Sequence, residues 1–129
     1  MPEYNHILRF IDSYKEYGFT NCIYNASGYD FTLNISDRVV FAELETSWSK
    51  YIYHRHYLDK RFKNVELLIL PQRIIKSSQP NYQKFRLLPE IILIMSRHIF
   101  YRWDIVNYSV KLIPVDKFVR EHTLQAKEQ

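Results

Sequence analysis

Residues 29–45 alternate between apolar and polar side chains in two stretches, which predicts two strands joined by the short turn Ser36-Asp37. Side chains in a strand repeat every two residues, so each strand has one face of its own composition. The first strand places on one face Phe31, Leu33 and Ile35. Asp30 lies on its other face. The second strand places on one face Val39, Phe41, Glu43 and Glu45.

The same pattern analysis predicts elements along the rest of the chain. Helices are expected at residues 2–17, ended by Gly18, from Thr46 or Ser47 to about Phe62, and at residues 115–124. Further strands are expected at residues 19–25, 65–70, 91–95 and 110–113, and a helix or turn at residues 100–107. A helical crossover precedes residues 65–70, so that strand should lie parallel to an earlier one. The order αβββαβ, then β(α)βα, predicts an α/β fold with a mixed central sheet flanked by helices.

Composition limits the class of protein. The 129 residues suit one domain covering residues 1–129, with one core, and 47% of them are hydrophobic. No apolar run approaches the roughly 20 residues that span a bilayer. The beginning of the chain lacks the apolar core of a signal peptide. The single cysteine, Cys22, excludes an intramolecular disulfide and a cysteine zinc site. We therefore expect a cytoplasmic protein with no membrane partner.

Charge and aromatic content are compatible with nucleic acid. The net charge is +4 and aromatic residues make up 16% of the chain, with 11 tyrosines. Tyrosines and basic residues interleave at residues 51–57 and again at residues 100–103. Such mixtures can contact a phosphate backbone and stack on bases. They can equally be core aromatics with solvated charges between them, and the sequence leaves both interpretations open.

The Glu43-Leu44-Glu45 triplet follows an apolar run that has the character of a buried strand. Two carboxylates project together from this strand, and its hairpin partner can add Asp30. Converging carboxylates repel one another unless a cation is present, and hard oxygen ligands suit Mg²⁺ or Mn²⁺. The alternative is an ordinary solvated strand face, where a Glu-x-Glu triplet is common.

The helix expected after residue 46 has two faces. Trp48, Ile52 and Phe62 are spaced to face the sheet, whereas the opposite stripe is basic and aromatic. This stripe contains Lys50, His54, Tyr57 and Arg61. The polar segment after Pro71 adds the basic residues Arg73 and Lys76.

Residues 3–70 resemble the PD-(D/E)XK nuclease superfamily, whose core is αβββαβ, with an aspartate at its second strand and a (D/E)-x-K triplet on its third. Asp30 matches the aspartate and Glu43-Leu44-Glu45 the triplet. The strand–helix–strand step that follows is similar to archaeal Holliday-junction resolvases and to mobile-element or viral nucleases. The resemblance implies a restriction-endonuclease-like core, a Mg²⁺ (or Mn²⁺) ion held by Asp30, Glu43 and the carbonyl of Leu44, and a homodimer.

The chain departs from the family pattern at Glu45, where most members carry lysine. Some restriction endonucleases with Glu-x-Glu are active, so the departure does not exclude catalysis. Lys50 could supply the missing charge, or it could be an ordinary exposed helix lysine. Glu16 or Glu3 could add a ligand from the first helix, as a carboxylate does in some resolvases.

The function expected from the resemblance is that of a Mg²⁺-dependent deoxyribonuclease acting on duplex or branched DNA. Asp30 and Glu43 would bind the metal, Glu45 would act on the attacking water, and Lys50 would assist catalysis. Contacts with the DNA backbone would come from Lys50, His54, Arg61, Arg73 and Lys76. The alternative is a non-catalytic nucleic-acid-binding or regulatory protein on the same scaffold. A third class is an interaction module that uses tyrosine-rich surfaces.

Overall fold

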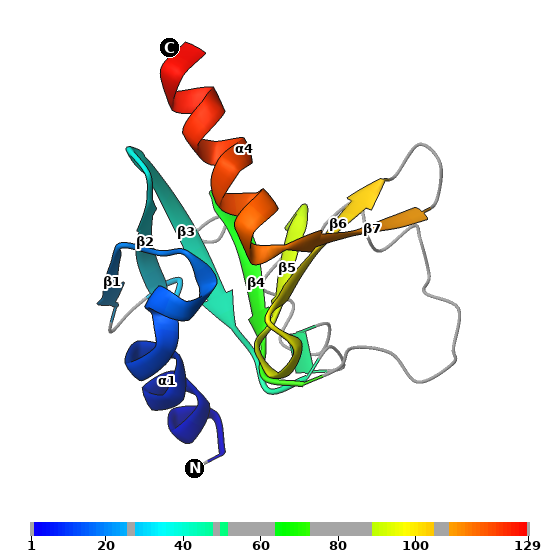
Figure 1. Ribbon diagram of the computed structural model, residues 1–129. Coiled ribbons are helices and arrows are strands. Elements are labelled where there is room, and N and C mark those ends of the chain that lie inside the picture. Colours follow the sequence, from blue (N-terminus) through cyan, green and yellow to red (C-terminus); the bar gives the residue numbers. More distant parts are fainter. Residues whose placement is uncertain are drawn as a thin grey trace.

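The computed structural model describes residues 2–25, 28–47, 50–51, 64–72, 89–104 and 109–128; of residues 2–3, 103–104 and 124–128 it describes the backbone alone. The chain is an α/β protein with one seven-stranded mixed sheet, an N-terminal helix and a C-terminal helix (Figure 1). The helices are α1 (Pro2–Ser13), continued by the 3-10 turn η1 (Tyr14–Tyr17), and α4 (Val115–Glu128), with a further 3-10 turn η4 (Met95–Arg97). The strands are β1 (Asn21–Tyr24), β2 (Phe31–Ile35), β3 (Arg38–Leu44), β4 (Val65–Leu70), β5 (Ile91–Ile94), β6 (Ile99–Asp104) and β7 (Ser109–Pro114).

The strands lie in the sheet in the same order as in the chain, from β1 at one edge to β7 at the other. The strands β1, β2 and β3 form the expected antiparallel meander. The strands β3, β4 and β5 are parallel, which confirms the expectation for residues 65–70. The strands β6 and β7 complete the sheet in antiparallel pairing. Parallel strands are usually buried on both faces, and the continuous apolar sequences of residues 67–70 in β4 and of β5 agree with this.

One face of the sheet packs on both helices. Phe10 of α1 contacts Phe31 of β2, with ring centroids 4.9 Å apart, and Phe118 of α4 stacks on Phe100 of β6 at 3.8 Å. Phe19 contacts rings from both helices and so joins the two halves of this core. Over β4 and β5 the opposite face is buried as well, at Leu68, Leu70, Ile92 and Ile94.

Gly18 ends the first helical segment, as the sequence predicts. Its φ of 93° is left-handed, and its N–H donates to the carbonyl of Lys15 at 3.1 Å. A Cβ atom at this position would overlap Cγ2 of Val119 on α4. Gly18 is therefore required both by the backbone conformation and by the close approach of the C-terminal helix.

The helix or turn expected at residues 100–107 is wrong over the described part of that range, because residues 100–104 belong to strand β6. This strand pairs on one side with β5 and on the other with β7. Its sequence, IFYRWD, is rich in β-branched and aromatic residues, which favour strands once neighbours are available on both sides. Smaller differences are Met95, which begins η4 rather than ending β5, and α4, which continues to Glu128.

Residues 50–51 are helical, and Ser47 precedes them. The Ser47 side chain accepts a hydrogen bond from the N–H of Lys50 at 3.2 Å, and its carbonyl accepts one from Tyr51 at 3.1 Å. This confirms the expected cap. The predicted burial of Trp48, Ile52 and Phe62 lies outside the described residues. Among the helices of the described segments, none is long and apolar enough to cross a membrane.

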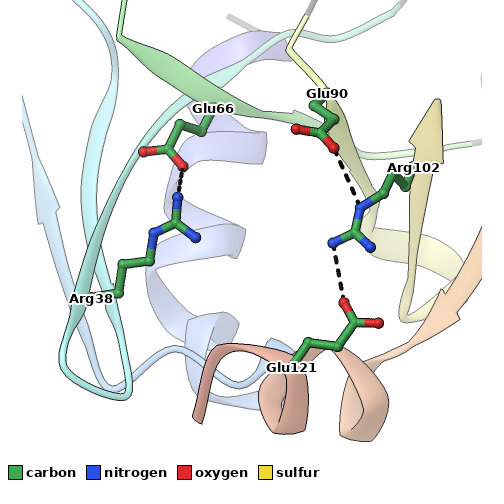
Figure 2. A network of polar contacts seen from close by, with 5 residues as sticks. All are labelled: Arg38, Glu66, Glu90, Arg102 and Glu121. Atoms are coloured by element: carbon green, nitrogen blue, oxygen red, sulfur yellow. Dashed lines mark hydrogen bonds and ion pairs between the residues drawn. The ribbon is translucent and has the colours of Figure 1, made fainter. Parts of the chain in front are cut away.

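Two sets of ion pairs tie the strands together and to α4 (Figure 2). Arg38 of β3 reaches Glu66 of β4 at 2.6 Å. Arg102 of β6 lies between Glu90, at 3.7 Å, and Glu121 of α4, at 3.1 Å. The Arg38 pair is well exposed, and such pairs contribute little to stability.

Candidate carboxylate site

The β2–β3 pairing brings Asp30 and Glu43 together. Phe31 lies opposite Ala42, so Asp30, one residue earlier, stands opposite Glu43 on the other face of the hairpin. The Asp30 carboxylate accepts a hydrogen bond from the N–H of Leu44 at 2.9 Å. The Asp30 carbonyl accepts one from the N–H of Asn25 at 2.7 Å. Asp30 is therefore fixed between β1 and β3, just before β2 begins.

Glu43 is a buried carboxyl group, with only 3% of its surface exposed. Its pKa is raised from 4.5 to about 10, first by burial, then by the charge of Asp30, by a side-chain hydrogen bond with Asp30 and by the charge of Glu45. Without a cation, Glu43 is thus protonated at neutral pH and can donate that hydrogen bond to Asp30. Its Oε2 atom is buried and has no hydrogen-bond partner. An ordinary solvated strand face, the alternative left open by the sequence, does not describe this residue.

Glu45 follows directly after β3. It is 1% exposed, and its N–H donates to the carbonyl of Ile69 at 3.0 Å, which extends the parallel pairing with β4. Its charge contributes to the raised pKa of Glu43, so the two side chains interact. Within the described segments, however, no group of three or more His, Cys, Asp or Glu side chains is arranged to hold a metal ion. The close pair is Asp30 with Glu43.

A divalent cation fits this pair in its chemistry. Mg²⁺ is commonly held by one or two carboxylates, with the remaining positions filled by water and substrate phosphate oxygens. Asp30 and Glu43 supply two such carboxylates, and the buried, unpartnered Oε2 of Glu43 is an oxygen that a cation would satisfy. A cation would also replace the shared proton, because it stabilises both carboxylates in their charged form.

The basic residues expected to contact DNA are only partly described. Lys50 is exposed and lies in the first turn of the helix that Ser47 caps. The other four positions, His54, Arg61, Arg73 and Lys76, lie outside the described residues.

The carboxylates expected from the first helix do not join the pair in the described structure. Glu16 is exposed and lies 3.9 Å from His98. Helix α1, which precedes Glu16, packs on the face of the sheet opposite to the Asp30–Glu43 pair. The side chain of Glu3 is outside the described set.

Several side chains beside the carboxylate pair were not singled out from the sequence as site residues. The Tyr29 ring contacts the Phe41 ring, with centroids 4.7 Å apart. Asn25 donates from Nδ2 to the Thr32 hydroxyl at 3.3 Å. Strand alternation does place Phe41 with Glu43, but no sequence pattern brings Tyr29 and Asn25 to the same place.

Comparisons of the chain with models of protein families, with curated proteins and with solved structures find no match.

Proposed function

We propose that this protein is a metal-dependent DNA endonuclease of the PD-(D/E)XK type. The observation that carries the proposal is the contact between the partly buried carboxylate of Asp30, just before β2, and the buried carboxyl group of Glu43 on β3, whose charges disfavour each other. A protein gains no stability from such a pair, and strongly perturbed carboxyls of this kind are concentrated at functional sites.

The arrangement of the strands also supports the proposal. An N-terminal helix, an antiparallel β1–β2–β3 meander and a parallel β4 follow the order expected of a restriction-endonuclease-like core. Asp30 and Glu43 lie at the positions in that order where the resemblance puts the acidic motif residues. One fold can host many functions, so the agreement in strand order makes a nuclease more expected but does not by itself indicate one. The main support comes from the carboxyl groups of the site.

In the proposed reaction, water attacks the phosphorus of a DNA phosphodiester, the P–O bond to one sugar oxygen breaks, and that oxygen leaves as a protonated hydroxyl group. Asp30 and Glu43, with the carbonyl of Leu44, would hold Mg²⁺ or Mn²⁺. The ion would supply positive charge at the phosphate and lower the pKa of bound water. Glu45 would orient that water or accept its proton. Lys50 is the nearest cation in sequence to substitute for the motif lysine.

Backbone contacts would come from the basic residues of the expected stripe, namely Lys50, His54, Arg61, Arg73 and Lys76. Such contacts position DNA without reading its sequence. The proposal includes a homodimer, as the resemblance implies. A cleavage assay that compares DNA with one cleavable strand and DNA with two cleavable strands would distinguish a monomeric from a dimeric enzyme.

The second candidate is a non-catalytic nucleic-acid-binding or regulatory protein on the same scaffold. The observation in its favour is Glu45, which places a buried carboxylate next to Glu43 where the family has a cation. Such a protein would bind DNA in a salt-dependent way and cleave nothing.

The test compares the wild-type protein with Glu43→Gln on plasmid, single-stranded and branched DNA, in Mg²⁺ and in Mn²⁺. The amide is almost the same size as the carboxyl group but is a poor ligand for a hard cation. We expect cleavage by the wild type and none by Glu43→Gln. Metal-free DNA binding should be the same for both, because the raised pKa already leaves Glu43 neutral. Glu90→Gln, a change at an exposed carboxylate, is the matched control and should cleave normally.

The other outcomes have definite meanings. Equal cleavage by wild type and Glu43→Gln would place the activity in another site or in a contaminant. Absence of cleavage by either, together with salt-dependent DNA binding, would favour the second candidate. Lys50→Ala separates two roles of Lys50: a modest loss of DNA binding indicates a phosphate contact, whereas a sharp loss of turnover indicates that it replaces the motif lysine.

A further inference from the structure

Two aromatic rings lie beside the carboxylate pair on the same face of the sheet. Phe41 precedes Glu43 by two residues on β3, so both side chains project the same way. Tyr29 directly precedes Asp30, and its ring contacts that of Phe41 at 4.7 Å, with an angle of 41° between the planes. The acidic pair and the aromatic pair are thus adjacent, and each is made of one residue from the β3 strand and one from the segment before β2.

These rings differ from the aromatic residues of the core. Phe10, Phe19, Phe31 and Phe118 are between 0% and 1% exposed. Tyr29 and Phe41, in contrast, are each partly exposed. Towards the β1 edge, the same face continues through Thr32 to Ile23, whose side chain is 51% exposed. The aromatic pair therefore keeps surface that another ring can cover.

The polar groups around the aromatic pair can form hydrogen bonds with a nucleobase. Asn25 stands next to Asp30 in the ladder, and its amide reaches Thr32, so it lies on the same face as Phe41. An amide and a hydroxyl beside an aromatic ring can form hydrogen bonds with the edge of a base while the ring stacks on its plane. The spacing also agrees: two residues along a strand cover about 6.6 Å, which is comparable to the separation of a phosphate from the base of its own nucleotide.

We propose that Tyr29 and Phe41 form a stacking site for an unpaired base whose phosphate lies at Asp30 and Glu43. The inference rests on the proposed function and specifies its substrate: DNA with an unpaired nucleotide at the scissile phosphate, as in single strands and branch points. A base inside a duplex has neighbours on both of its planes and has to be unstacked at a cost before it can use the site.

The test measures binding, so it does not depend on cleavage. A fluorescein-labelled 12-nucleotide single strand and its duplex are titrated with protein in EDTA at constant salt, and binding is followed by anisotropy. The variants are Tyr29→Leu, which removes the ring, and Tyr29→Phe, which keeps it. Tyr24→Leu is the matched control, because Tyr24 is an exposed tyrosine of β1 whose ring contacts Phe31 on the opposite face.

Wild type should bind the single strand more tightly than the duplex. Tyr29→Leu should weaken single-strand binding by about 5- to 150-fold, the usual range for loss of one base–aromatic stack, and should change duplex binding by less than twofold. Tyr29→Phe and Tyr24→Leu should bind like wild type. Equal weakening of single-strand and duplex binding by Tyr29→Leu would overturn the proposal, as would an equal loss in Tyr24→Leu.

The wild-type protein provides a second measurement if Tyr29→Leu fails to fold, which circular dichroism would show. A single strand with 2-aminopurine at successive positions should show a fluorescence change at one position on binding, because a base that changes its stacking partner changes its emission. No position-dependent change, or a wild-type preference for duplex, would overturn the inference. The two proposals fail separately: single-strand preference without Mg²⁺-dependent cleavage removes the nuclease alone, and cleavage of intact duplex with no effect of Tyr29→Leu removes the stacking site alone.

Discussion

The two faces of the β2–β3 hairpin have opposite characters. The buried side chains of the helix-covered face are apolar and between 0% and 3% exposed, at Phe31, Leu33, Ile35, Val40, Ala42 and Leu44. On the other face, one residue away at each step, lie Thr32, Phe41 and the carboxyl groups of Asp30 and Glu43. Both faces bury side chains, but only the first gains stability by doing so.

The difference between the two faces shows that the carboxylate face has a composition that stability alone does not favour. An apolar residue at position 43 would pack against the buried Leu68 without any electrostatic cost, because Glu43 lies beside Leu68 in the parallel ladder. The chain instead has a glutamate whose Oε2 lacks a hydrogen-bond partner. We attribute this local cost to the proposed cation site, since strain and unsatisfied groups in native proteins are concentrated at functional positions.

The largest effect is expected on the helix-covered face. Leu33→Ala should lower the free energy of unfolding by about 4 kcal/mol, because it removes a fully buried side chain and leaves a cavity. Urea denaturation measures this change. The variant should retain cation binding in proportion to its folded fraction, and a loss of less than about 1 kcal/mol would show that this face is not the main core.

On the carboxylate face, Glu43→Gln should stabilise the protein when divalent ions are absent. The pKa of Glu43 is about 10 in the folded protein and 4.5 in the unfolded chain. Between pH 4.5 and pH 10 the folded protein therefore binds more protons than the unfolded chain. Stability should therefore fall as pH rises through this interval, by about 4 kcal/mol between pH 5 and pH 8.

The amide does not titrate, so the Glu43→Gln variant should lose most of this slope and be the more stable protein at pH 8. Urea denaturation in EDTA at several pH values measures both slopes. Parallel stability curves for the two proteins would contradict the assignment of the pKa shift to Glu43. Glu90→Gln, at an exposed position, serves as the control and should follow the wild type.

A divalent cation should remove the same cost in the wild type. At a Mn²⁺ concentration ten times the dissociation constant, the gain in stability is about 1.4 kcal/mol. We expect a rise in melting temperature for the wild type at pH 8, a smaller rise at pH 5 where protons compete, and none for Glu43→Gln. Differential scanning calorimetry with Mn²⁺ and with EDTA measures it. An equal rise in both proteins would indicate that Mn²⁺ binds elsewhere.

The smallest effect is expected for the exposed pair of Arg38 and Glu66, which joins β3 to β4 away from the Asp30–Glu43 pair. Its side chains are 44% and 41% exposed, so Arg38→Gln should cost no more than about 0.5 kcal/mol despite the short distance of 2.6 Å. Thermal melts at low and high salt measure the change. A larger cost that disappears in salt would show that charge at this edge affects the whole sheet.

Sequence alternation was sufficient to predict the faces of the hairpin, because its period is the period of the strand itself. It placed Asp30 opposite the apolar set and Glu43 with Phe41, as observed. Residues 100–104 were not recognised as strand, because their aromatic run has no clear period and its pairing partners lie elsewhere in the chain.

Contacts between groups that are distant in the chain could not be predicted from the sequence either. The hydrogen bond from the N–H of Leu44 to Asp30 joins residues 14 positions apart, and it depends on the register of the two strands. The extent of the pKa shift at Glu43 follows from burial, which a linear pattern of polar and apolar residues indicates only roughly. The ring contact of Tyr29 with Phe41 likewise arises from the turn that precedes β2.

The packing of α4 against Gly18 has a consequence for the order of events during synthesis on the ribosome. Each strand pairs with its neighbour in the chain, so the sheet can grow strand by strand as the chain emerges. Val119, however, closes against Gly18, and Phe118 reaches Phe19, across about a hundred residues. Until α4 has emerged, the helix side of the nascent sheet remains exposed near Phe19 and Phe100. Chaperone binding to chains stalled before residue 115 should therefore be stronger than to chains stalled after α4 is free of the exit tunnel.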